Sequence, residues 1–429
     1  MGNFHATRPL SYAEADIMGQ FPVLNAYTML LYGFQLPLDV DNHSIVSMLQ
    51  KTFDDLVARI PLFGCQVGTK ESGLRTVLPW PENMRKERVH VNICDDSIAS
   101  MEELLVAKNP ARMLDGKELC PWPALPMPHG LTGPAPVVAL QANFICGGLI
   151  LTLAAHHTIM DGTADFQFLK MFFDLLSGRE LESVDLEQAN RDRSQLIPLI
   201  PEGEPVKDYP HLLSSSKPAF VMPASQPIWC YFLMPVESLN KLVKRARDNQ
   251  LGKDVQISSD DILSAFYWKR LCALRIARGM PPDTESKCSR AINTRIALGI
   301  PSSYIGAQIS PCITRLSLAQ VIELNITQLA QILRTDLMEA ATPWAVRSFA
   351  TFISRKSPEA RAKLLYTGSH DSNTDIGFTN MSKLERPRGV LGTVGAMSLL
   401  SPPEYGADSR LIPDSGTRGW CLPYHDMLA

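Results

Sequence analysis

One stretch of the sequence decides how this chain folds, LILTLAAHHTIMDG at residues 149–162. It begins as an apolar run typical of a buried strand and ends at two adjacent histidines, His156 and His157. Asp161 and Gly162 follow, and an aromatic-rich segment with helical spacing comes soon after them. A strand that ends at a histidine, with a loop and a helix behind it, predicts a base presented at a cleft.

The bulk composition is that of a globular protein without a basic surface. The chain has 429 residues, of which 45% are hydrophobic and 20% are charged, and its formal net charge is −3. This length suits two domains better than one core. The charge argues against nucleic-acid binding and a polybasic membrane-binding surface, and no apolar run reaches the roughly 18 residues that a transmembrane helix needs. We expect a soluble protein with neither kind of partner.

The cysteines and the N-terminus favour a cytoplasmic location. The nine cysteines are dispersed and never form a CxxC pair, which suits reduced thiols better than a disulfide framework. Residues 1–7 lack the apolar core of a signal peptide, and Ala6 stands where the myristoylation pattern requires Ser or Thr.

The chain divides nearly in half at a polar, breaker-rich segment, where apolar periodicity disappears. We predict an N-terminal domain over 1–187, a crossover linker over 188–226 and a C-terminal domain over 227–429. Strand and helix patterns alternate in both halves, which indicates an α/β fold. The clearest elements are strands at 27–34, 136–144, 228–233 and 375–380, a hairpin turn at 146–148, and helices at 236–247, 258–271 and 318–337.

The residues around His157 suit general base catalysis. A histidine near its ordinary pKa can take a proton from a hydroxyl or an amine at neutral pH. Asp161 could orient the imidazole directly or hold the loop that presents it, and Gly162 would let the chain bend tightly behind it. We interpret His156 as a buried packing residue.

Two other chemistries find less support in the sequence. Two His and one Asp could bind a metal ion, but no HExxH motif, third nearby His or Cys pair accompanies them. A serine or cysteine nucleophile would lack an elbow motif such as GxSxG. We therefore predict no metal site, and a metalloenzyme remains a minor alternative.

The segment HHTIMDG at 156–162 resembles the HHxxxDG signature of the superfamily of chloramphenicol acetyltransferases and condensation domains. Within that superfamily, the chain resembles the BAHD acyltransferases over most of its length, especially the fungal branch that includes trichothecene 3-O-acetyltransferase. The other segments that carry the resemblance are RPLS at 8–11, CGGL at 146–149, the capped helix from Ser258 to Trp268, INTR at 292–295, and Pro301 with YIG at 304–306.

The resemblance implies two chloramphenicol-acetyltransferase-like domains, each a mixed β-sheet flanked by helices, with the active site in a channel at their interface. An acyl-CoA would enter from one face and the acceptor from the other. By this likeness His157 is the general base, and Asp161 pairs with Arg295 in a structural role. Thr379 occupies the position of the family's Thr-Ser-Trp segment and would donate a hydrogen bond to the oxyanion.

The chain departs from the family pattern in its last part. The family's Asp-Phe-Gly-Trp-Gly motif, which supports the fold near the CoA channel, falls on residues 390–394, where only Gly392 matches. Ala307 replaces an asparagine of the family, and Met381 replaces a tryptophan. The tail also ends sooner than the resemblance leads us to expect. These departures bear on CoA affinity more than on the chemistry.

We predict an acyl-CoA-dependent O-acyltransferase that transfers acetyl from acetyl-CoA to a hydroxyl of a specialised metabolite such as a terpenoid, polyketide or alkaloid. Acetyl-CoA is a co-substrate, Lys253 and Ser258 are candidates for holding its phosphate, and no cofactor is expected to be tightly bound. The protein is expected to be a monomer. One alternative is a catalytically impaired relic of the fold that acts as a binding protein. Another is a condensation-type enzyme that takes acyl groups from a carrier protein.

Overall fold

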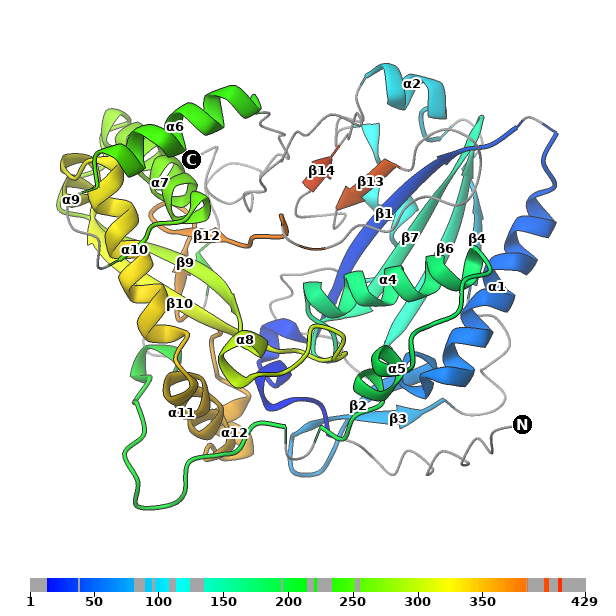
Figure 1. Ribbon diagram of the computed structural model, residues 1–429, viewed down its shortest axis with the longest axis horizontal. Helices are drawn as coiled ribbons and strands as arrows, with labels where there is room; N and C mark the ends of the chain where they lie inside the picture. Colours follow the sequence, from blue (N-terminus) through cyan, green and yellow to red (C-terminus); the bar gives the residue numbers. More distant parts are fainter. Residues whose placement is uncertain are drawn as a thin grey trace.

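The computed structural model contains two groups of strands and helices that lie side by side (Figure 1). One group holds strand β7 (Gly148–His156) and helix α4 (Gly162–Leu176), and the other holds β9 (Glu285–Asn293) and α7 (Ser259–Ala277). The structure describes residues 14–37, 39–80, 89–94, 97–107, 113–123, 135–193, 196–213, 220–221, 234–250, 255–382, 384, 397–400 and 408–410.

The first group is built on a mixed, six-stranded sheet in the order β14-β13-β1-β7-β6-β4. β7 pairs antiparallel with β1 and β6, and its last residue, His156, lies opposite Tyr27. The hairpin predicted at 146–148 joins β6 to β7, and Gly147 in its turn has a φ of 71°, which favours glycine. The other strands are β1 (Tyr27–Gln35), β4 (Val89–Ile93), β6 (Val138–Ile145), β13 (Met397–Leu400) and β14 (Asp408–Arg410).

Helices cover both faces of this sheet, because alternate residues of a strand point to opposite sides. On β1, Leu30 and Phe34 join the core that also contains the buried face of α4, whereas Met29 and Leu31 join a second core on the opposite face. The helices whose residues enter these cores include α1 (Asn42–Arg59), with α4, on the first face and α2 (Met101–Val106) and α3 (Gly116–Leu119) on the second.

The second group is a three-stranded sheet in the order β10-β9-β12, with helices packed against it (Figure 1). Trp268 of α7 is fully buried, and its indole N–H donates a hydrogen bond to Ser286 Oγ at 2.9 Å. This bond ties α7 to β9. The remaining elements of the group are β10 (Ile309–Ser317), β12 (Ile376–Phe378), α6 (Val236–Asp248), α9 (Leu318–Glu323) and α10 (Ile326–Ala340).

One helix prediction is wrong. The single helix expected over 318–337 is two helices, α9 and α10, because Asn325 begins a new helix: its side chain accepts a hydrogen bond from Gln328 N at 3.0 Å. The strand expected at 375–380 is present as the shorter β12. The strand expected at 228–233 lies outside the described residues.

Two smaller sheets and several short helices complete the described chain. β2 (Cys65–Thr69) pairs with β3 (Arg75–Pro79) and β5 (Ala135–Pro136), and β8 (Phe220–Val221) pairs with β11 (His370–Asp371). The short helices are α5 (Ser183–Ala189), α8 (Arg295–Leu298), α11 (Pro343–Ser354), α12 (Pro358–Arg361), η1 (Ile17–Gly19), η2 (Pro22–Leu24), η3 (Pro61–Gly64) and η6 (Pro210–Leu212). In the part of the chain described, no helix combines the length and apolar character that a membrane crossing requires.

The two groups meet at the start of α4. After β12 the chain turns toward the large sheet, and the partly buried Met381 and Leu384 pack against the core under α4. Met381 Cε lies 3.3 Å from the position that a Cβ on Gly162 would occupy. In addition, β13 and β14 follow β12 in sequence but pair within the sheet of β1. The C-terminal part of the chain therefore contributes to both groups.

At Gly19 the N-terminal segment packs closely against the turn after β7. A Cβ at position 19 would lie 2.0 Å from the carbonyl oxygen of Thr158, where no flexible side chain can yield. We expect Gly19→Ala to lower the free energy of unfolding by about 1–3 kcal/mol or more, measured by urea denaturation. Gly68→Ala is the control, because its Cβ would meet only the end of the Leu78 side chain. Equal losses in the two variants would contradict this account.

Candidate active site

His157 lies in the turn directly after β7, half-buried, and its backbone N–H donates to the carbonyl oxygen of Ala26 at 2.9 Å. Its ring atom Nδ1 lies 2.9 Å from the carbonyl oxygen of Met160. A carbonyl oxygen can only accept, so in the neutral imidazole Nδ1 carries the proton and Nε2 carries the lone pair. Nε2 is therefore the basic atom.

Burial lowers the pKa of His157 below its ordinary value of 6.5. The Met160 carbonyl and the negative charge of Asp161 oppose this shift without reversing it. The imidazole is consequently neutral at pH 7, which is the form that a general base must have.

His156 has a different environment. It is fully buried, its Nδ1 accepts a hydrogen bond from Thr158 N at 3.3 Å, and its ring meets the Tyr27 ring edge-on at 5.2 Å. Burial lowers the pKa of His156 to about 3, with smaller contributions from Arg75 and His157. A histidine that stays neutral, packs against Tyr27 and accepts from the backbone of the turn fits the structural role expected for His156.

Asp161 and Arg295 form a buried ion pair, with 1% and 2% of their side chains exposed. The contacts are bidentate: Arg295 Nη1 lies 2.6 Å from Oδ2, and Nη2 lies 3.1 Å from Oδ1. The same carboxylate accepts hydrogen bonds from Ala164 N at 3.0 Å, which caps α4, and from Gln308 N at 2.8 Å. Its bonding capacity is used on these four donors, and the ring of His157 bonds Met160 instead.

Arg295 extends this contact into the second group of elements. Its Nη2 also donates to the carbonyl oxygens of Tyr304, at 3.1 Å, and Gly306, at 2.8 Å. Asn293, at the end of β9, accepts from Arg295 and donates from Nδ2 to Thr163 Oγ1 at 3.2 Å. The start of α4 is thereby bonded to the end of β9.

Gly162 is the first residue of α4, as expected from the sequence, but the reason for a glycine differs. It does not have a positive φ, so no unusual bend requires it. The limit is space, because Met381 Cε would touch a side chain at this position.

A second buried carboxylate, Asp16, stabilises the adjoining loop, and no local pattern in the sequence marks it. It accepts hydrogen bonds from Tyr304 Oη at 2.7 Å and Ala307 N at 3.0 Å, and Arg193 Nη1 lies 3.8 Å away. Burial raises the pKa of Asp16, and the charge of Arg193 opposes that shift. Gly306 is needed here, because its Cβ would lie 2.2 Å from the ring of Tyr304.

Of the remaining candidate residues, Thr379 and Ser258 lie in the described part of the chain. Thr379 is exposed and directly follows β12, two residues before Met381 reaches Gly162. The hydroxyl of Ser258 caps α7: it accepts from Asp261 N at 3.3 Å and donates to Asp261 Oδ2 at 2.6 Å. Lys253 and Gly392 lie outside the described residues.

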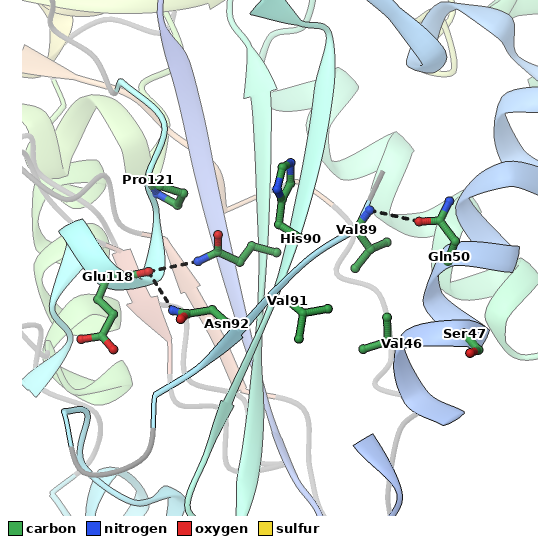
Figure 2. Close-up of a pocket in the computed structure, with 10 residues that line it drawn as sticks. Val46, Ser47, Gln50, Val89, His90, Val91, Asn92, Glu118 and Pro121 are labelled. Atoms are coloured by element: carbon green, nitrogen blue, oxygen red, sulfur yellow. Dashed lines mark hydrogen bonds between the residues drawn. The ribbon is translucent and has the colours of Figure 1, made fainter. Parts of the chain in front are cut away.

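A pocket of about 700 Å³ lies elsewhere, at the β4 edge of the large sheet (Figure 2). It is lined by Val46, Ser47, Gln50, Val89, His90, Val91, Asn92, Glu118, Pro121 and Gln141. None of these residues belongs to the His157 turn, and His90 packs edge-on against Trp122 at 5.3 Å. The pocket therefore lies apart from the His157 turn. Across the described ranges, no three His, Cys, Asp or Glu side chains are grouped so as to hold a metal ion.

Asp161→Asn should destabilise the protein, because Arg295 would keep a buried charge without its carboxylate. We expect the free energy of unfolding to fall by about 3–5 kcal/mol in urea denaturation, since breaking a buried pair leaves an uncompensated charge. Asp55→Asn, which removes an exposed contact to Lys51, is the control and should change stability by less than about 1 kcal/mol. Lost activity at unchanged stability in Asp161→Asn would instead point to direct participation in proton transfer.

Two family models match the chain. The Transferase family matches residues 126–376, and the trichothecene 3-O-acetyltransferase-like N-terminal domain matches residues 26–174. The chain is 36% identical to the O-acetyltransferase SAT5 of Stachybotrys chartarum, over 96% of this chain and 92% of that one. It is 33% identical to the O-acyltransferase pigD of Monascus ruber, over 91% and 88% of the two chains.

Solved structures confirm the predicted fold class. The structure of Fusarium sporotrichioides TRI101 complexed with coenzyme A and T-2 has a TM-score of 0.76 and 26% identity, covering 87% of this chain and 84% of that one. The structure of F. graminearum TRI101 complexed with coenzyme A and deoxynivalenol has a TM-score of 0.78 at 24% identity, over 87% and 85% of the two chains.

Proposed function

Because this chain belongs to the Transferase family of BAHD acyltransferases, we propose that it transfers an acyl group from an acyl-CoA to a hydroxyl group, with His157 as the general base. The observation that carries this proposal is the hydrogen bond from His157 Nδ1 to the Met160 carbonyl, which leaves the lone pair of Nε2 available. Burial keeps that imidazole neutral at the pH where it must accept a proton.

The reaction follows from the atoms of the site. Nε2 of His157 takes the proton of the acceptor hydroxyl, and the resulting alkoxide oxygen attacks the thioester carbonyl carbon. The C–O bond forms and the carbonyl becomes a tetrahedral oxyanion, to which Thr379 would donate a hydrogen bond. When the C–S bond breaks, the CoA thiolate takes the proton from Nε2. The base is regenerated in each turnover, so no tightly bound cofactor is needed.

Asp161 would act on this reaction through the loop rather than on the substrate. Its pair with Arg295 and its cap on α4 hold the turn that ends at Met160, whose carbonyl sets the tautomer of His157. Asp161 is therefore proposed as a positioning residue.

The relatives suggest the substrates. SAT5 is an O-acetyltransferase, pigD is an O-acyltransferase, and a solved TRI101 structure contains coenzyme A together with T-2 mycotoxin. We propose acetyl-CoA as the donor and a hydroxyl of a terpenoid, polyketide or alkaloid as the acceptor. Lys253 and Ser258 remain proposed contacts of the CoA phosphate, although the hydroxyl of Ser258 is engaged as a helix cap.

We further propose a cytoplasmic monomer with domains over 1–187 and 227–429, joined by a linker over 188–226, and without nucleic-acid or membrane partners. The six-stranded sheet and the β9 sheet support two domains. In this division, β13 and β14 belong to the C-terminal domain but pair within the sheet of the N-terminal domain. Residue Gly392, proposed to support the fold, precedes β13 in sequence.

His157→Ala is the direct test of the proposed function. Without the base, kcat should fall by roughly 10²–10⁴-fold. The assay follows thiol release from acetyl-CoA with a panel of terpenoid, polyketide and alkaloid alcohols. His90→Ala, in the pocket at the β4 edge, is the matched control and should keep wild-type rates. An unchanged rate in His157→Ala would refute the proposal.

The pH dependence of the reaction should show the lowered pKa of His157. The base is active when unprotonated, so kcat/KM falls as pH drops through the pKa of His157. Because burial moves that pKa below 6.5, we expect the acidic midpoint of kcat/KM to lie below pH 6.5. A midpoint at or above 6.5, with the protein folded by circular dichroism, would contradict the assignment.

A further inference from the structure

Asp165 is a buried carboxyl in the first turn of α4 that the proposed reaction does not use. It is 2% exposed, and its Oδ2 lies 2.8 Å from Thr28 Oγ1 of β1. Its Oδ1 has no hydrogen-bond partner among the residues that the structure describes. Asp161, one turn earlier, is paired with Arg295, but Asp165 forms no ion pair within the described part of the chain. A buried carboxylate with one hydrogen bond and no cation beside it is costly, which favours the neutral acid.

The contacts of the Thr28 hydroxyl bear on the protonation state of Asp165. Thr28 Oγ1 also lies 3.3 Å from the carbonyl oxygen of Ala155, its partner across β1 and β7. A hydroxyl carries one proton, and a carbonyl oxygen can only accept. Thr28 can therefore donate to Ala155 only when Asp165 supplies the proton of the 2.8 Å contact. A protonated Asp165 satisfies both contacts, whereas an ionised Asp165 would leave the Ala155 contact without a hydrogen.

The electrostatic surroundings of Asp165 agree with the acid form. Burial raises the pKa of Asp165 well above its ordinary value of 3.8, and the negative charge of Asp161 on the same helix adds to the shift. The hydrogen bond from Thr28 and the positive charge of Arg295 on α8 oppose the shift without reversing it. Asp161 and Arg295 are the charged groups that act on Asp165 in the described chain.

This carboxyl lies behind the turn that carries His157. Helix α4 covers the face of the sheet that contains β1 and β7 (Figure 1), and Ala155 is two residues before His157. Ala26, just before β1, accepts from His157 N at 2.9 Å. At the other end of the turn, Asp165 N donates to the carbonyl oxygen of Asp161 at 2.9 Å. Asp165 is thereby connected to both ends of the turn.

We propose that Asp165 is a positioning residue that works as a neutral carboxylic acid: its proton sets the direction of the hydrogen bonds that run from α4 through Thr28 to β7, behind His157. This inference deepens the proposed function, on which its kinetic part rests. Ionisation would add a second buried negative charge beside Asp161 and would turn the Thr28 hydroxyl away from Ala155. Both changes would displace the turn that positions His157.

Asp165→Asn tests the protonation state, because it keeps the size and a donor to Thr28 but has no proton to release. The equilibrium constants for unfolding are measured by urea denaturation from about pH 5 to 7. Folded wild-type protein keeps a proton that the unfolded chain releases, so its constant should rise about tenfold per pH unit relative to the variant. Asp55→Asn, which removes an exposed carboxylate, is the control and should show no such trend against wild type. Parallel pH dependence in wild type and Asp165→Asn would overturn the inference.

Asp165→Leu tests the positioning role, because leucine fills the space without offering a donor to Thr28. Kinetics are measured with acetyl-CoA and the alcohol of the panel that the wild-type protein acetylates fastest. Small displacements of a catalytic group slow the chemical step, so kcat should fall about 10- to 100-fold in Asp165→Leu. KM should stay unchanged for both substrates, and the conservative variant Asp165→Asn should restore kcat. Equal kcat values in Asp165→Leu and wild type would mean that Asp165 only fills space.

The infrared spectrum at about pH 7 gives a readout that needs no activity. A protonated carboxyl should give a C=O stretching band that is absent in Asp165→Asn and shifted in Thr28→Val, where the acid loses its acceptor. If Asp165→Asn does not fold, the shift in Thr28→Val still assigns the band. A spectrum without this band, or a band that neither variant changes, would mean that Asp165 is ionised. Failure of the proposed function looks different: wild-type protein would release no more thiol than His157→Ala with any alcohol, while the pH and infrared results would hold.

Discussion

The buried pair between Asp161 and Arg295 is the contact on which the site depends. Removing two charges from water carries a desolvation cost. A buried pair offsets that cost only when further hydrogen bonds satisfy its remaining donors and acceptors. Here Ala164 N and Gln308 N donate to the carboxylate of Asp161. The carbonyl oxygens of Tyr304 and Gly306 accept from the guanidinium of Arg295. One ion pair thereby joins the start of α4, the His157 turn and the end of β9.

The negative charge of Asp161 lies in the same loop as His157 but is not bonded to its imidazole. A carboxylate bonded directly to the imidazole would favour the protonated ring, whereas the neutral Met160 carbonyl selects a tautomer with a weaker effect on the pKa. Burial then keeps His157 neutral. The nearby negative charge of Asp161 is paired with Arg295, so the loop is stabilised without a carboxylate bond that would favour a cationic His157.

Much of this organisation is local enough to be predicted from periodicity and capping. The hairpin into β7, the helix after Gly162 and the capped helix at Ser258 all follow from residues close together in sequence. The apolar pattern over 318–337 does not indicate the break between α9 and α10, although its cause is local as well: the Asn325 cap begins a new helix there.

The contacts that make a site have a different origin. Asp161 lies 134 residues from Arg295, and Asp16 lies 288 residues from Tyr304. Spacing cannot relate such pairs; family resemblance suggested the first, and nothing suggested the second. Backbone periodicity and capping act over a few residues and are written in the sequence, whereas burial, tautomer and ion pairing depend on which distant surfaces pack together.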